Sequence, residues 1–212
     1  MAVSDMSFIR ISVLITAGLA GCASTYQVVQ VPQRDADLYP LSQTRAGVSV
    51  AIDEITSSDR AASYFGANLV QAGIIPLVVV ISNNGTHRID VKPADVLLSR
   101  GTQIIDPLPL ETVVAIAKQQ HGALRTSTQK SVADYFEGLA FSEMILPPGA
   151  TYQGVMFFPI PKQQVNSDSM FSAMTLFRES GMQILVGSRD LDTGNRVRFG
   201  PFSVASAPNT SK

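Results

Sequence analysis

The sequence predicts a mainly β protein, an antiparallel β-sandwich with a small helical insertion. Successive short apolar stretches are separated by turn residues such as glycine, proline and asparagine, which is typical of sandwich folds. Residues 109–139 differ, because their apolar residues recur at helical spacing. The chain has one cysteine, so the predicted domain has no internal disulfide and must be stabilised by packing.

The chain opens with a leader that ends at this cysteine. Arg10 is the only basic residue before a mostly apolar run over residues 11–19, which leads into Leu19-Ala20-Gly21-Cys22. A run of about nine residues is too short to cross a hydrocarbon layer of about 30 Å as a helix. The layout of a charged start, a short apolar run and small residues predicts a removable signal peptide over residues 1–21.

The four residues 19–22 resemble the lipobox of bacterial lipoproteins, an aliphatic residue and two small residues before a cysteine. The resemblance implies cleavage between Gly21 and Cys22, and acylation of the Cys22 thiol and of the new amine by lipid chains such as palmitate. Two or more chains hold a protein stably on a membrane. Ala23 stands where an aspartate would favour the inner membrane. The resemblance therefore implies an outer-membrane anchor, with the domain facing the periplasm.

The net charge of the chain indicates which class of partner it can attract. Lys and Arg total 16 against 17 Asp and Glu, which leaves a net charge of −1. Such a chain has no large field to attract nucleic acid. The partners that we expect are the membrane, through the lipid on Cys22, and an envelope protein or cell-wall component.

The first half of the mature chain reads as a tether followed by strands. Residues 22–46 are polar with prolines and are predicted to be the lipidated cysteine and a tether, in which 26–31 could pair as a strand. The domain is predicted over 47–204. Ser57 or Ser58 before Asp59 suits a helix start. The further elements expected in this half are a strand at 47–55, a helix or compact turn at 61–73, and strands at 74–81, 86–91, 96–98 and 102–105.

Residues 74–81 are the most apolar segment after the leader and predict a strand at the centre of a sheet. Asn83-Asn84-Gly85 suits a tight reversal, so we predict that residues 74–91 form a hairpin.

The second half contains the insertion and the last strands. A helix is expected over 109–120, and Ser131 to Asp134 has the pattern of a capping box for a second helix, after a loop at 122–129. The apolar residues of these helices are expected to be core rather than a docking face; they are Val113, Val114, Tyr135, Phe136 and Leu139. Strands are expected at 150–159, 174–178, 182–189 and 196–204, with a hairpin loop at 192–195 and a polar tail at 205–212.

Two of these stretches resemble the immunoglobulin-like domains of secreted and lipid-anchored bacterial proteins. Residues 76–95 are similar to a strand, turn and strand of that family, and residues 146–159 to its later Pro-Gly turn and Gly-x-x-x-Phe strand, with Gly154 and Phe158 in those places. The resemblance implies an immunoglobulin-like sandwich, and it bears on fold more than on function.

Motifs that could support catalysis or metal binding are sparse. Ser127 and Lys130 have Ser-x-x-Lys spacing, in which a lysine amine can deprotonate a serine, and they define an envelope hydrolase alternative. Asp190, Asp192 and Asn195 place oxygen ligands around a glycine, as calcium loops do, although a hairpin needs the same residues.

The two histidines, His87 and His121, lie in different predicted elements. We expect no metal, because metal sites usually have three or four protein ligands, and we expect no cofactor.

The sequence therefore favours a non-catalytic, lipid-anchored module that binds or positions another envelope component. An accessory subunit of a secretion or pilus assembly is an alternative that differs in its partner, and the hydrolase is an alternative from another class.

The anchor is directly testable. Cells that express the protein and are fed a palmitate analogue are expected to label it, and Cys22→Ala should abolish the label because the acceptor thiol is gone. In-gel detection after immunoprecipitation measures this. Incorporation that survives Cys22→Ala would refute the anchor.

Overall fold

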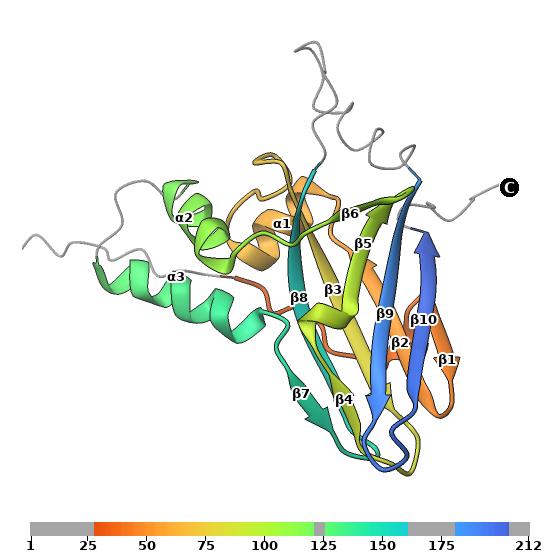
Figure 1. Ribbon diagram of the computed structural model, residues 1–212. Coiled ribbons are helices and arrows are strands. Elements are labelled where there is room, and N and C mark those ends of the chain that lie inside the picture. The colour runs from red at the N-terminus through yellow and green to blue at the C-terminus, as the bar shows by residue number, and fades with distance from the viewer. Residues whose placement is uncertain (1–27, 121–125, 161–180, 204–212) are drawn as a thin grey trace, which may run out of the picture.

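The structure is a computed structural model that describes residues 28–120, 126–160 and 181–203 (Figure 1). In these ranges the chain is mainly β, with antiparallel strand pairs and three α-helices. The helices are α1 (Ser58–Phe65), α2 (Leu110–Gln120) and α3 (Thr126–Leu139), with 3-10 turns η1 (Ala36–Leu38) and η2 (Pro93–Asp95).

The strands form two sheets. The four-stranded sheet has the order β1-β2-β3-β8, from β1 (Ser42–Arg45), β2 (Val48–Glu54), β3 (Ile74–Asn83) and β8 (Thr151–Pro159). The six-stranded sheet has the order β6-β5-β9-β4-β7, with β10 paired to β9. Its strands are β4 (Ile89–Val91), β5 (Val96–Arg100), β6 (Gln103–Ile105), β7 (Met144–Leu146), β9 (Met182–Asp190) and β10 (Arg196–Ser203).

The strand β3 lies between two cores, and every one of its residues is buried. Leu77 and Val79 face a core shared with the six-stranded sheet, in which Ile184 of β9 takes part. Val78 and Val80 point the other way, into a core shared with the helices. The prediction that this strand lies inside a sheet is confirmed, and its continuous apolar run follows from burial on both faces.

Helices cover the outer face of the four-stranded sheet (Figure 1). Ser57 caps α1 by accepting a hydrogen bond from the Arg60 N–H at 3.4 Å, as its sequence position predicted. Phe65 of α1, Phe136 of α3 and Phe157 of β8 join the layers, with ring centroids 5.7–5.9 Å apart.

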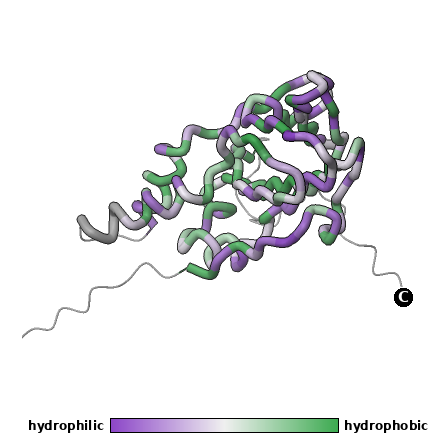
Figure 2. Tube along the Cα trace, turned by 90° about the horizontal axis from the view of Figure 1, so that it is seen from below, coloured by the Kyte–Doolittle hydropathy of each residue, from purple (hydrophilic) through white to green (hydrophobic). Residues whose placement is uncertain are grey.

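The apolar residues of the insertion are core, as predicted. Val113, Val114 and Phe136 are buried, and Tyr135 and Leu139 pack against the same cluster. Figure 2 shows the corresponding distribution along the chain, with hydrophobic stretches in the body of the domain and hydrophilic ones around its periphery.

The insertion is attached to the edge strand β8 at both ends. Before α2, the Leu108 N–H donates to the Phe157 carbonyl at 2.7 Å, and after α3 the Phe141 N–H donates to the Val155 carbonyl at 2.9 Å. An uncovered strand edge can pair with another chain. These bonds occupy part of that edge and hold the helices over the sheet.

The predicted hairpin over residues 74–91 is wrong. β3 pairs with β2 and β8, whereas β4 pairs with β7 and β9 in the other sheet. The turn carries the chain from one sheet to the other, and the buried Asn83 stabilises it. Its Nδ2 donates to the carbonyls of His87 at 2.8 Å and Leu146 at 3.0 Å, and its Oδ1 accepts from the Gly85 N–H at 3.1 Å.

Helix α3 begins earlier than predicted. It starts at Thr126, five residues before the expected cap at Ser131, within the stretch predicted as a loop. The residues 126–130 have no apolar periodicity, so the sequence gives no helix signal over this first part of α3.

The tether prediction for residues 22–46 is also wrong over its second half. Val31 and Ala36 are buried, and β1 pairs with β2 along its whole length. Residues 28–31 form no strand, in contrast to the prediction for 26–31. Two buried positions that do not recur at a strand or helix period give no sequence signal for an element of the domain. For this reason the sequence predicted a linker here.

The remaining strand predictions agree with the structure where it describes the chain. β5 and β6 pair, β8 matches the strand at 150–159, and β9 and β10 form the predicted hairpin. The strand expected at 174–178 and the tail at 205–212 lie outside the described residues. None of the helices in the described ranges has the length and apolar character needed to span a bilayer.

Gly154 tests the attachment of the insertion. A Cβ at Gly154 would lie 2.6 Å from the Phe141 Cα and 2.9 Å from its Cβ, so Gly154→Ala must displace this backbone. We expect a loss of about 1–3 kcal/mol in the free energy of unfolding, the usual range for overpacking, measured by urea denaturation.

Gly138→Ala is the matched control. It lies in α3 with open space around it, and it should stabilise the protein by about 0.5–1 kcal/mol through helix propensity. Equal effects of the two substitutions would contradict the proposed close approach.

Candidate functional site

The lipobox and the Ser-x-x-Lys motif lie in or near parts of the chain that the structure does not describe. Leu19, Ala20, Gly21 and Cys22 lie outside the described residues, as does His121. Ser127 and Lys130 lie in the first two turns of α3, where no side chains are described. The lipid anchor and the hydrolase alternative therefore stay predictions.

The predicted calcium ligands lie at the β9–β10 turn, where hydrogen bonds already engage the carboxylates. Asp190 accepts from the N–H groups of Asp192 at 2.9 Å and Thr193 at 3.0 Å, and its Oδ2 lies 2.9 Å from the His87 Nδ1. The Asp192 carboxylate accepts hydrogen bonds from the backbone N–H and from the guanidinium of Arg88, both at 3.0 Å.

These contacts connect the β9–β10 turn to the loop before β4. Asn195 contributes backbone bonds to the turn, through its carbonyl to the Asp190 N–H at 2.8 Å and its N–H to the Thr193 hydroxyl at 3.3 Å. Within the described residues, no group of three or more His, Cys, Asp or Glu side chains is disposed to hold a metal. The geometry is that of a structural turn.

These bonds shift the acidities of both carboxyls. Partial desolvation raises the pKa of Asp190, but hydrogen bonds from Thr193, His87 and Asp192 outweigh it and hold the pKa well below its usual range. Hydrogen bonds from the backbone and the side chain of Arg88 lower the pKa of Asp192. Both groups are therefore bound as carboxylates.

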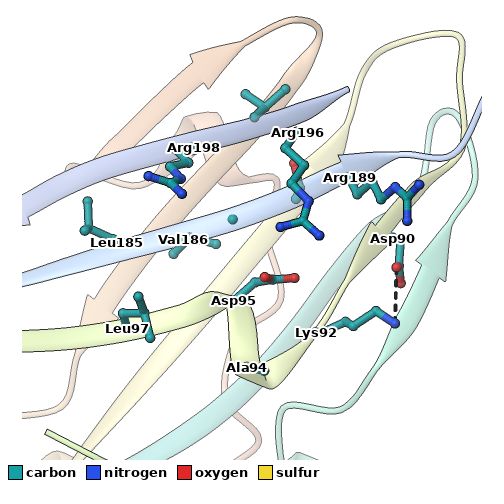
Figure 3. A pocket seen from close by; sticks show the side chains of 13 residues that line it. Asp90, Lys92, Ala94, Asp95, Leu97, Leu185, Val186, Arg189, Arg196 and Arg198 are labelled. Carbon is teal, nitrogen blue, oxygen red and sulfur yellow. Dashed lines mark ion pairs between the residues drawn. The ribbon is translucent and has the colours of Figure 1, made fainter. Parts of the chain in front are cut away.

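A cavity of about 410 Å³ lies on the outer face of the six-stranded sheet (Figure 3). It is lined by residues of η2 and of strands β4, β5, β9 and β10. Its charged lining residues are Lys92, Arg189, Arg196 and Arg198 with Asp90 and Asp95. This is the candidate functional site, and we call it the arginine face.

Strand register brings the three arginines together. Arg189 is the cross-strand partner of Arg196, and Arg198 pairs with Gly187, so all three follow the outward parity of their strands. Met182, Ile184 and Val186 of β9 and Phe199 of β10 are buried on the opposite parity. Alternation therefore places the cations on the solvent side while the same strands build the core.

Gly187 provides the floor of the cavity. A Cβ at this position would lie 3.1 Å from the Asp95 Cβ, so the missing side chain lets η2 approach β9. Leu97 and Leu185, which are register partners on β5 and β9, continue the lining with apolar surface. Leu97 is 39% exposed. The site thus combines cations with an adjacent apolar strip.

Charge in the site is only partly neutralised. The Lys92 Nζ lies 3.4 Å from Asp90 Oδ2 and 2.7 Å from Glu143 Oε1. Arg189, Arg196 and Arg198 have no ion pair with any residue that the structure describes. Arg189 is opposite Arg196 on β10 and opposite Asp90 on β4. Like charges directly opposite on neighbouring strands are destabilising, and an anion bound at Arg196 would relieve the part of this repulsion that Asp90 does not offset.

This arrangement suits binding. Guanidinium groups bind carboxylate or phosphate through paired N–H donors. Among the described residues, the cavity lining contains no histidine, cysteine or tyrosine. Ser188 lines it, but its side chain is buried at 3% exposure and follows the inward parity of β9.

This face was not predicted from the sequence. The alternation of Arg196, Val197, Arg198 and Phe199 marks a strand with cations on one side, and this signal is present in the sequence. The contribution of Arg189 and the closure by η2 depend on strand pairing and had no local signal.

No protein-family model and no curated protein matches this sequence. Among solved structures, YcdA of Bacillus subtilis, provisionally described as a lipoprotein, is 10% identical with a TM-score of 0.38; the match covers 79% of this chain and 38% of YcdA. YjhA of Bacillus subtilis is 10% identical with a TM-score of 0.39, over 75% of this chain and 94% of YjhA.

A Bordetella pertussis protein provisionally assigned as ApaA is 10% identical with a TM-score of 0.33, over 75% of this chain and 88% of that chain. These values are too low to identify a shared family or function.

The β9–β10 turn predicts a pH dependence of stability. Because the pKa of Asp190 is lower in the folded than in the unfolded chain, its stabilisation is complete above the ordinary carboxyl pKa of about 4 and is lost as the pH falls below it. We expect Asp190→Asn to lower the Tm at pH 7 and to flatten the acid-side fall in Tm, measured by circular dichroism.

Asp106→Asn, at an exposed acid outside the turn, is the control and should change neither quantity. An unchanged acid-side profile in Asp190→Asn would refute the assigned role of this carboxylate.

Proposed function

We propose that the protein is a non-catalytic binding module of the cell envelope, anchored through lipid on Cys22, that binds another envelope component with the arginine face. The observation that carries this proposal is the contrast between the two outer faces of the sheets. Helices bury the outer face of the four-stranded sheet, whereas the six-stranded sheet presents three arginines, Arg189, Arg196 and Arg198, that have no ion-pair partner among the described residues.

The lipid anchor and the outer-membrane location are proposed from the sequence. The lipobox-like residues 19–22 support lipidation, and Ala23 supports the outer membrane, with the domain in the periplasm. Antiparallel pairing and two sheets around a shared core are in keeping with an immunoglobulin-like sandwich. An accessory subunit of a secretion or pilus assembly would use the same face for its own partner.

Site-specific photo-crosslinking in living cells tests the binding surface. A photoreactive residue at Leu97, beside the cations, is expected to give an adduct with a partner, whereas one at the exposed Glu111 of α2 should give none. Arg196→Glu with Arg198→Glu should abolish the Leu97 adduct, because charge complementarity is reversed. Immunoblotting and mass spectrometry of the adducts measure this.

Equal adducts from both positions, or a Leu97 adduct that survives the double substitution, would contradict the proposal. Expression and Tm of the double variant are measured alongside, so that loss of the fold is recognised.

A further inference from the structure

The direction in which the arginine face points follows from where the chain enters the domain. Residues 28–38 lie on the helix side of the four-stranded sheet. The Val29 N–H donates to the Ser63 carbonyl of α1 at 2.9 Å, and the Ala36 N–H donates to the Ser82 hydroxyl at 2.9 Å. Val31 and Ala36 are buried in the same core as the helices. The arginine face is on the opposite side, on the outer surface of the other sheet.

The segment between the predicted lipid anchor at Cys22 and the first described residue is too short to reach around the domain. At about 3.3 Å per residue, the six steps from Cys22 to Val28 span at most about 20 Å. A domain of this size is roughly 40 Å across, from the scaling of the radius of gyration with length. A lipidated Cys22 therefore holds the helix side toward its membrane, and the exposed Val29 and Leu38, at 57% and 66%, lie in this entry segment.

We propose that the arginine face, directed away from the anchoring membrane, binds an extended acidic segment of a partner protein. This inference rests on the proposed function and names its ligand class. Arg196 and Arg198 alternate along β10, which spaces them by about 7 Å. An extended peptide has the same two-residue repeat, so carboxylates at alternate positions meet both guanidinium groups.

The rest of the face fits the same ligand. Arg189 lies across from Arg196 in the strand register and adds a third guanidinium to the face, with Asp90 of β4 as its partner on the other side. Leu97 and Leu185 lie side by side on the adjoining strands and accept an apolar side chain of the segment. Gly187 lies between the arginines and the leucines, and because it has no side chain the Asp95 side chain approaches it closely.

The acidic residues of the face favour a peptide over a dense polyanion. Asp90 and Asp95 line the same cavity as the arginines, and they would repel closely spaced phosphates. A peptide with separated carboxylates can place single charges at Arg196 and Arg198 without a continuous run of negative charge beside Asp90 and Asp95. The orientation of the face also directs it away from the headgroups of the anchoring membrane.

Calorimetric titration of the full-length protein in a non-ionic detergent tests the inference. The probe is a short synthetic peptide with glutamate at alternate positions and leucine at one end, and its control has glutamine in place of glutamate. We expect saturable binding of the glutamate peptide only. Arg196→Gln with Arg198→Gln should weaken it about tenfold or more, because two charge-assisted contacts are lost.

Arg34→Gln is the matched variant, because Arg34 is an exposed arginine of the entry segment on the helix side. It should change the dissociation constant by less than about twofold, as a substitution remote from the site. Inorganic phosphate and a soluble short-chain phosphatidylglycerol, titrated at matched ionic strength, represent the other anions, and neither should bind in an arginine-dependent way.

Three results would overturn the inference: equal binding of the glutamine peptide, no peptide binding at all, or arginine-dependent binding of phosphatidylglycerol or phosphate in place of the peptide. If any of these occurs while the Leu97 adduct persists in cells, the ligand class is wrong and the binding module stands. If the adduct itself is absent, the proposed function fails.

Discussion

Burial of β3 on both faces is the constraint on which the rest of the structure depends. A strand with ten buried residues needs an apolar layer on each side. The six-stranded sheet supplies one layer and the helices supply the other. Because the chain has one cysteine and residues 47–204 contain none, this packing replaces the disulfide that stabilises many small extracellular domains. The helical insertion is therefore part of the core and is needed to close it.

Within the described ranges, the same constraint leaves one large sheet face without a helix layer. The helices cover the four-stranded sheet, and their attachment to β8 restricts them to that side. The outer face of the six-stranded sheet is then the broad strand surface on which functional side chains can be placed without disturbing the core. Alternation along β9 and β10 places buried apolar residues and exposed arginines on the same two strands. The core residues and the arginines thus lie on opposite faces of one hairpin.

The short distance between Cys22 and the first described residue changes how the anchor is understood. A long tether would leave the domain free to turn in any direction. Because β1 and the segment before it belong to the domain, a lipid anchor at Cys22 would join the domain on the side of the helix layer. Lipidation would then orient the domain as well as retain it, and the face opposite the helices becomes the accessible one.

Local patterns in the sequence determined the elements whose signal lies within a few residues. The buried run of β3, the Ser57 cap and the β9–β10 hairpin could be predicted, because period, capping and turn chemistry are local.

Only the tertiary structure decided which strands pair. Asn83-Asn84-Gly85 is a turn in either case, but the side-chain bonds of Asn83 to His87 and to the distant Leu146 send the chain to the other sheet. The arginine face likewise joins residues from four strands and η2. The face is formed by contacts between segments that are distant in the sequence, and a local sequence pattern carries no information about such contacts.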